Sequence, residues 1–270
     1  MKYKMLVLDM DDTLLNDDYK ISEKNKIALF KAQELGVHVV LASGRPTPAM
    51  NAYAEELELG KYGSHILSYN GAVITDVRNN TVLFEQSLTK EDIHRLHDFS
   101  LEHKVHIITY IDGAIVSESH SEFIAVEKKL TGMPHHKVEY FKDAVQTSAI
   151  KCILLEEPSY LKQVEAILKK AMPDKSVSTS KPFFLEVTQQ GIDKAASLER
   201  LAKQLSISAA EIIAVGNAGN DLSMIEYAGL GVWVDNVTPE LRDRAQVIVA
   251  SNNNDGVAEV VERFILNDRQ

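Results

Sequence analysis

The stretch Met5-Leu6-Val7-Leu8-Asp9-Met10-Asp11-Asp12-Thr13-Leu14-Leu15 decides the fold class of this chain. Its first four residues predict a buried strand, and two carboxylates follow where that strand should end. Because carboxylates are rarely buried without a partner, Asp9 and Asp11 indicate a negatively charged pocket that suits a hard cation. A carboxylate in such a pocket can also act as a nucleophile. The alternative interpretation is an acidic turn, since Asp and Asn also favour turns.

The composition is that of an ordinary globular protein and excludes several classes of function. The chain has 270 residues, of which 45% are hydrophobic, and a formal net charge of −10. This charge argues against a nucleic-acid partner, which requires a basic surface. No apolar run has the length of a membrane span. The single cysteine, Cys152, excludes an internal disulfide and is expected to be a buried apolar residue, so we expect a cytoplasmic protein.

Two parts of the chain alternate strands with helices, which is typical of a parallel sheet covered on both faces. The first part predicts strands at 4–9, 37–42, 65–69 and 72–75, a helix at 22–36 and another helix that begins at Pro46. The last part predicts strands at 212–215, 231–234 and 247–250. Its helices are expected at 193–205, after the loop 216–221, after Thr238-Pro239 and at 255–266. We therefore expect an α/β fold with a doubly wound, Rossmann-like parallel-sheet core.

The middle of the chain has a different pattern. A hairpin turn at 111–113 joins the predicted strands 105–110 and 114–117. Further strands are expected at 83–85, 150–155 and 183–187, and helices at 89–103, 121–130 and 159–171. Hairpins combined with helices favour an α+β unit. We predict a core of residues 1–82 and 187–270 that is interrupted by an inserted domain at 83–186.

Polar residues follow three of the predicted core strands. They are Asp9 and Asp11, then Ser43-Gly44, and then the loop 217–221, while Lys194 begins a predicted helix. The carboxyl ends of parallel strands meet at one edge of a sheet, so these residues should lie close together. Helices that start at this edge offer backbone N–H groups to a phosphate. The sequence therefore predicts a cation held by carboxylates beside a binding site for a dianion.

The same residues resemble the four motifs of the haloacid-dehalogenase-like phosphatases in order and spacing. The motifs are Asp9-Met10-Asp11-Asp12-Thr13, Ser43-Gly44-Arg45, Lys194 and Gly216-Asn217-Ala218-Gly219-Asn220-Asp221. The whole chain is similar to the Cof-type branch, in which a large α/β cap that recognises the substrate is inserted between the second and third motifs.

The resemblance implies a role for each matching position. Asp9 would accept the phosphoryl group, and Asp11 would act first as general acid and then as general base; Lys194 would complete the catalytic set. Phosphate would be bound by Met10 through its amide, Ser43, Gly44, Lys194 and Asn220. Mg²⁺, or Mn²⁺ as the alternative, would be held by Asp9, the main-chain carbonyl of Asp11, Asn217 and Asp221.

Two positions depart from the family pattern. Asp12 stands where glycine is usual, and Asn217 stands where an aspartate usually binds the metal. An amide oxygen can bind a hard cation, but it brings no charge, so we expect a lower metal affinity. We expect activity to survive, because the other motif residues are present.

The resemblance implies a Mg²⁺-dependent phosphatase of small phosphorylated metabolites, acting as a monomer or homodimer without nucleic-acid or membrane partners. Sugar phosphates, nucleotide- or flavin-pathway phosphates and pyridoxal phosphate are the substrate classes considered. A phosphotransferase or mutase is one alternative, and a non-catalytic protein that binds a phosphorylated ligand is another, because of Asn217.

Arg45 and the pair Asn70-Gly71 can each be interpreted in two ways from the sequence. Arg45 either reaches the mouth of the site or gives the sheet edge a charge. Asn70-Gly71 is either a simple turn between two strands or, by the resemblance, a loop that borders the cap.

Overall fold

The computed structural model describes residues 2–267, which divide into two compact units. One unit contains the chain up to Phe84 and from Asp193 onward, and the other is Glu85–Ile192. The inserted unit thus begins and ends later than the predicted 83–186. The reason is strand pairing: β5 (Thr81–Glu85) is an edge strand of the core sheet, whereas β11 (Phe184–Gln189) pairs with strands of the inserted unit.

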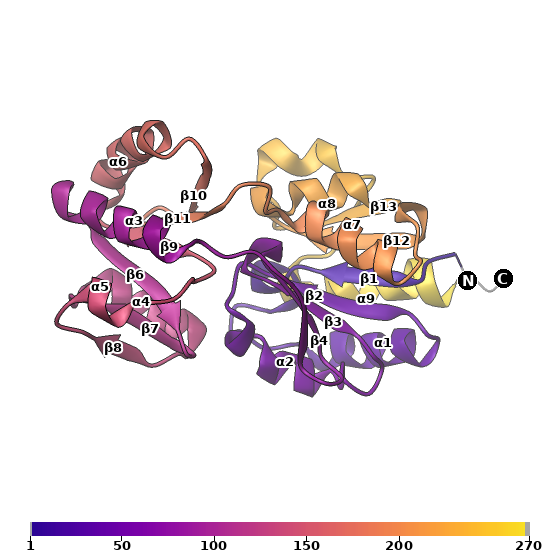
Figure 1. Cartoon of the computed structure of the whole chain (residues 1–270). Helices are drawn as coiled ribbons and strands as arrows, with labels where there is room; N and C mark the ends of the chain where they lie inside the picture. The colour runs from indigo at the N-terminus through magenta and orange to yellow at the C-terminus, as the bar shows by residue number, and fades with distance from the viewer. Residues whose placement is uncertain (1, 268–270) are drawn as a thin grey trace. The chain divides into compact units, whose positions relative to one another are not determined.

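Within the described part of the core unit, the strands form one sheet in the order β14-β13-β12-β1-β2-β3-β4-β5 (Figure 1). The pairs from β14 to β3 are parallel, and β3 pairs with β4 in antiparallel fashion. The bounds are β1 Met5–Leu8, β2 His38–Ala42, β3 His65–Ser68, β4 Val73–Asp76, β12 Ile212–Gly216, β13 Leu230–Val234 and β14 Val247–Val249. The expected parallel core is therefore confirmed, and β1 lies in its middle.

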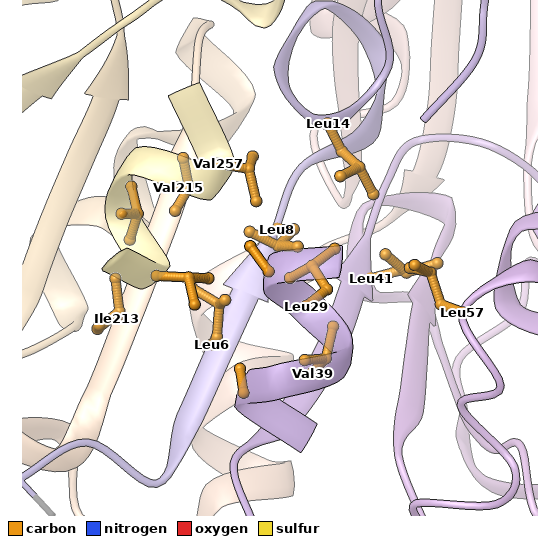
Figure 2. Packing of buried hydrophobic residues seen from close by; sticks show 14 of the residues in the cluster. Leu6, Leu8, Leu14, Leu29, Val39, Leu41, Leu57, Ile213, Val215 and Val257 are labelled. Atoms are coloured by element: carbon orange, nitrogen blue, oxygen red, sulfur yellow. The ribbon is translucent and has the colours of Figure 1, made fainter. Parts of the chain in front are cut away.

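Both faces of this sheet are covered, because alternate residues of each strand point to opposite sides. Leu6 and Leu8 belong to the apolar cluster under α1 and α9 (Figure 2), whereas Met5 and Val7 belong to the cluster under α7 and α8. The core helices are α1 Glu23–Glu34, α2 Asn51–Glu56, α7 Lys194–Gln204, α8 Leu222–Tyr227 and α9 Gly256–Val261. This arrangement confirms the predicted doubly wound fold.

The described inserted unit contains a second sheet, in the order β10-β11-β9-β6-β7-β8. Its pairs are antiparallel except for β7 with β8. The remaining bounds are β6 His106–Ile111, β7 Ala114–Ser117, β8 His135–Lys137, β9 Cys152–Leu155 and β10 Lys175–Lys181. Two of these strands were not expected from the sequence: β8, which has three residues, and β10, whose residues are mostly polar.

Helices α3 (Lys90–Glu102) and α6 (Pro158–Ala171) pack against one face of the second sheet and form its apolar core. The other helices of this unit are α4 (Glu122–Thr131) and α5 (Phe141–Ala144). The unit is α+β, as predicted. None of the helices in residues 2–267 combines the length and the apolar content that a membrane span requires.

We predict that the native protein resists thiol reagents. Cys152 on β9 is fully buried, and this burial raises the pKa of its thiol to about 12. The reactive thiolate is therefore scarce at pH 8. Ellman's reagent should label the folded protein at a rate set by transient opening, and should label one thiol per chain rapidly in guanidinium chloride. Rapid stoichiometric labelling of the folded protein would contradict this prediction.

Candidate active site

Asp9 lies at the carboxyl end of β1, in the middle of the core sheet. Its backbone N–H donates to the carbonyl of Val215 (3.0 Å), which extends the pairing of β1 with β12 by one residue. The next residues, Met10–Leu14, form an irregular turn in which Asp12 has a φ of 58°. This turn takes the backbone away from the sheet and leaves the Asp9 carboxylate at its edge, where only 5% of the residue is exposed.

Lys194 connects the ends of several core elements. It is the first residue of α7, whose N-cap is Asp193. Its fully buried ammonium donates hydrogen bonds to Asp9 Oδ1 (2.6 Å), Asp221 Oδ1 (2.6 Å) and the carbonyl of Ala42 (2.8 Å). The three acceptors follow or end β1, β12 and β2. One side chain therefore fixes the relative positions of three strand ends and a helix.

The cluster pairs one lysine with two carboxylates, Asp9 and Asp221. Burial alone would lower the pKa of Lys194, but Asp221 and Asp9 raise it by more than burial lowers it. The resulting pKa is about 12, so the lysine is cationic. Burial and the nearby Asp221 raise the pKa of Asp9, and Lys194 opposes this change. With both carboxylates ionised, the cluster carries one net negative charge. Such a pocket favours a bound cation.

Asp221 has a full set of protein partners. Its Oδ1 accepts from Lys194, and its Oδ2 accepts from the backbone N–H groups of Asn217 (3.0 Å) and Ala218 (3.1 Å). The Asp221 side chain packs closely against Gly216, the last residue of β12, where an added Cβ would lie 2.5 Å from the Asp221 Cβ. Asp221 thus shapes the loop after β12. Among residues 2–267, no hydrogen bond joins the side-chain amide of Asn217 to a protein group.

The loops after β2 and β3 meet beside Asn220. Asn70 donates its backbone N–H to the carbonyl of Ser43 (2.8 Å), and its side-chain Oδ1 accepts from Asn220 Nδ2 (3.2 Å). A Cβ on Gly44 would lie 3.2 Å from Asn70 Nδ2, so the amide sits directly against this glycine. Three of the predicted phosphate-binding positions, Ser43, Gly44 and Asn220, are therefore gathered around Asn70.

Asn70-Gly71 is more than the simple turn between β3 and β4. Gly71 has a φ of +97°, and a Cβ there would lie 2.8 Å from the carbonyl of Asp193, at the start of α7. Only glycine allows this close approach. The sequence analysis did not assign Asn70 to the site. The signal was available, since Asn70 follows β3, another parallel strand that ends at the same edge.

Asp11 is paired with Arg45. Arg45 Nε donates to Asp11 Oδ2 (2.9 Å) and Nη2 donates to Oδ1 (2.6 Å), which makes a two-pronged ion pair. Arg45 follows Ser43-Gly44, and its backbone N–H donates to Ser43 Oγ (3.1 Å). Arg45 therefore lies at the mouth of the site, which was one of the two interpretations of this residue.

The structure thus brings most of the predicted residues to one edge of the core sheet. Asp9, Lys194 and Asp221 form a buried cluster, and Ser43, Gly44 and Asn220 lie around Asn70. Within the described residues, no three His, Cys, Asp or Glu side chains are grouped so that they could hold a metal by themselves. A metal at this edge would therefore need amide or main-chain oxygens in addition to carboxylates.

Comparison with known proteins gives matches along almost the whole chain. The profile of the haloacid dehalogenase-like hydrolases matches residues 6–261. The candidate phosphatase YxeH of Bacillus subtilis is 34% identical over 267 residues, which cover 98% of this chain and 99% of YxeH. The 5-amino-6-(5-phospho-D-ribitylamino)uracil phosphatase YcsE of the same organism is 29% identical, over 97% of this chain and 96% of its own.

Solved structures agree with these matches. A haloacid dehalogenase-like hydrolase from Bacteroides thetaiotaomicron is 36% identical and superposes with a TM-score of 0.92, covering 97% of this chain and 99% of its own. The protein TM0651 from Thermotoga maritima is 27% identical, with a TM-score of 0.85 and coverage of 97% of both chains. The fold is therefore shared over the core and the inserted unit.

We predict that Lys194→Met destabilises the fold by about 3–5 kcal/mol, because it leaves two buried carboxylates without their cation. The matched control is Lys203→Met on the same helix, where the lysine side chain is 74% exposed and pairs with Glu199. This control should stay within about 0.5 kcal/mol of the wild type. Urea unfolding in metal-free buffer measures both differences. Equal stability of the two variants would show that the buried cluster is not held together as described.

Proposed function

Because the chain belongs to the haloacid dehalogenase-like hydrolase family, we propose that it is a Mg²⁺-dependent phosphatase of small phosphorylated metabolites. This membership confirms the resemblance that the four motifs predicted. The observation that carries the proposal is the buried cluster of Asp9, Lys194 and Asp221 at the carboxyl edge of the sheet. It combines a carboxylate nucleophile with a fixed cation, which are the groups that phosphoryl transfer requires.

The first chemical step makes a covalent intermediate on Asp9. A carboxylate oxygen of Asp9 forms a bond to phosphorus while the bond from phosphorus to the leaving oxygen breaks. Asp11 gives its proton to that oxygen, so the product leaves as an alcohol. Lys194, held at 2.6 Å from Asp9 Oδ1, offsets the negative charge that gathers around the phosphoryl group.

The second step restores the enzyme. A water molecule attacks phosphorus, Asp11 takes a proton from that water, and the bond between phosphorus and Asp9 breaks. Inorganic phosphate leaves, Asp9 is again a carboxylate and Asp11 is again protonated. The Ser43 hydroxyl and the backbone N–H groups of Met10 and Gly44 would hold the phosphate oxygens through both steps, together with the Asn220 amide.

The residues at this edge fit a hard divalent cation. With Asp9 and Asp221 both ionised, the buried cluster has one net negative charge, and the oxygen donors that we assign to Mg²⁺ are the Asp9 carboxylate, the Asp11 main-chain carbonyl and the Asn217 amide. We assign Asp221 to pairing with Lys194 rather than to the metal, because both of its oxygens already accept protein hydrogen bonds. A bound Mg²⁺ would neutralise charge on the phosphoryl oxygens.

The proposed substrate range follows the predicted classes. The phosphatase YcsE, which is 29% identical to this chain, acts on 5-amino-6-(5-phospho-D-ribitylamino)uracil, a compound with a phosphorylated ribityl chain. This similarity supports a phosphorylated sugar, polyol or flavin-pathway compound as the substrate. We place the protein in the cytoplasm, where such metabolites occur.

The proposal predicts phosphate release from at least one member of a panel of sugar, polyol, nucleotide and pyridoxal phosphates. Release should require Mg²⁺ or Mn²⁺ and stop when EDTA is added. Asp9→Asn should lower kcat by at least about 10³-fold, because an amide does not act as the nucleophile. A malachite green assay measures the released phosphate. An Asp9→Asn variant with wild-type activity, or no release from any compound, would reject the proposal.

Asn217 supports the second candidate, a non-catalytic protein that binds a phosphorylated ligand. We predict instead that the wild type is active in millimolar Mg²⁺. Asn217→Asp should then lower the Mg²⁺ concentration for half-maximal activity by about tenfold, because ligand charge raises the affinity for a hard cation.

The control is Asn79→Asp, which makes the same charge change at an exposed position and should not alter this concentration. Activity that appears only in Asn217→Asp would support the non-catalytic candidate. In that case the wild type should bind inorganic phosphate without turning over any phosphate ester.

A further inference from the structure

We propose that Arg45 is the positioning residue for the general acid/base, and that it acts on the reaction through Asp11 rather than through the substrate. This inference rests on the proposed phosphatase function. The observation behind it is the two-pronged ion pair at the mouth of the site, which joins the turn after β1 to the loop after β2.

The pair fixes the orientation of the Asp11 carboxylate. Both carboxylate oxygens accept from the same planar guanidinium, at 2.9 and 2.6 Å, so the carboxylate cannot rotate without losing one bond. The Asp11 side chain is 42% exposed and follows an irregular stretch of backbone, which by itself leaves several side-chain orientations open. Among the described residues, Arg45 supplies the hydrogen bonds that select one of them.

Arg45 is itself held in place, as a positioning residue must be. Its side chain is only 10% exposed. The guanidinium carbon lies 5.9 Å from the ring centre of Tyr19 and 5.5 Å from that of Tyr53, which is within the range of cation–π attraction. The two tyrosines are joined by a hydrogen bond from the Tyr53 hydroxyl to the Tyr19 carbonyl (3.0 Å). The guanidinium is thus held by the rings of Tyr19 and Tyr53 and by its two hydrogen bonds to Asp11.

The same loop also carries a predicted phosphate-binding residue. The Arg45 backbone N–H donates to Ser43 Oγ (3.1 Å), so the residue that holds the acid and the residue that would bind the phosphate are linked. A displacement of this loop would move both groups together. When Asp11 acts as the acid, one of its oxygens carries the proton in place of its hydrogen bond from Arg45 and donates it to the leaving oxygen, and the other oxygen stays bonded to the arginine.

Two other roles for Arg45 are weaker on this geometry. As a purely structural ion pair it would contribute little, because pairs with a half-exposed partner are screened by solvent. As a direct substrate ligand, Arg45 would have to give up Asp11, because the Asp11 carboxylate already accepts from both Nε and Nη2. The arrangement therefore favours a role through Asp11.

The leaving group distinguishes these roles. A sugar alkoxide is a poor leaving group and needs a proton from Asp11, whereas p-nitrophenolate leaves without one. Arg45→Ala should therefore lower the rate of the first step, ester cleavage in a single turnover with excess enzyme, by about 10- to 100-fold for the best sugar phosphate of the panel. With p-nitrophenyl phosphate the loss in this step should be at most about threefold, and hydrolysis of the intermediate, which also uses Asp11, does not enter the measurement. Arg45→Lys keeps the charge but cannot make the two parallel hydrogen bonds, so its rate with the sugar phosphate should lie between those of the wild type and Arg45→Ala. This variant replaces Arg45→Ala if the alanine variant does not fold.

The matched control is Arg263→Ala, which removes an exposed arginine paired with Glu259 and should change neither rate. A second comparison uses Asp11→Asn. If Arg45 acts through Asp11, adding Arg45→Ala to Asp11→Asn should lower the rate no further, whereas independent roles would multiply the two losses.

The outcomes separate this inference from the proposed function. Equal losses of the first-step rate with both substrates, a rise in KM alone, or multiplied losses in the double variant would overturn the role of Arg45 and leave the phosphatase proposal intact. A wild type that hydrolyses neither substrate would overturn the phosphatase proposal, and this inference with it.

Discussion

The active edge of the core depends on one buried ammonium group. Lys194 Nζ binds two carboxylates and a main-chain carbonyl, and through them it connects α7 with the ends of β1, β2 and β12. Replacing a buried ion pair by apolar residues often costs a fold nothing, so stability alone does not account for this cluster. A charged group in a site that excludes water is, however, well suited to stabilise a phosphoryl group. Function therefore explains the cluster better than stability does.

The charge of the cluster determines what the edge can bind. With both buried carboxylates ionised, as the nucleophile requires, the single lysine between them leaves a net negative charge, which would repel a phosphate dianion. A divalent cation reverses that sign. The metal requirement that we propose thus agrees with the protein's own charges, and it does not depend on which side chain replaces the usual aspartate at position 217. In this proposal, that side chain determines only how firmly the metal is held.

The sequence was sufficient to predict which polar side chains gather at one edge of the core sheet, because the strand-end residues of a parallel sheet share an edge. It was not sufficient to predict how side chains pair there. The bonds of Asp11 to Arg45, and of Asn220 to Asn70, depend on the exact directions of loops far apart in the chain. For Asp221 the sequence suggested a metal ligand, whereas its contacts with Lys194 and two backbone amides became visible only in three dimensions. The strand β10 was missed for another reason: a mostly polar strand has no apolar alternation to reveal it.

The residues assigned to the chemical steps all lie in the core unit, and this separates the two tasks of the protein. Asp9 and the turn after β1 carry the nucleophile and the acid that we propose, and the loop after β2 carries Ser43 and Arg45. None of the catalytic positions that we propose lies within Glu85–Ile192, so the proposed chemistry does not constrain the inserted unit. We propose that its sequence changes with the leaving group while the phosphoryl chemistry stays fixed. Relatives that share this fold can act on different phosphorylated compounds for the same reason.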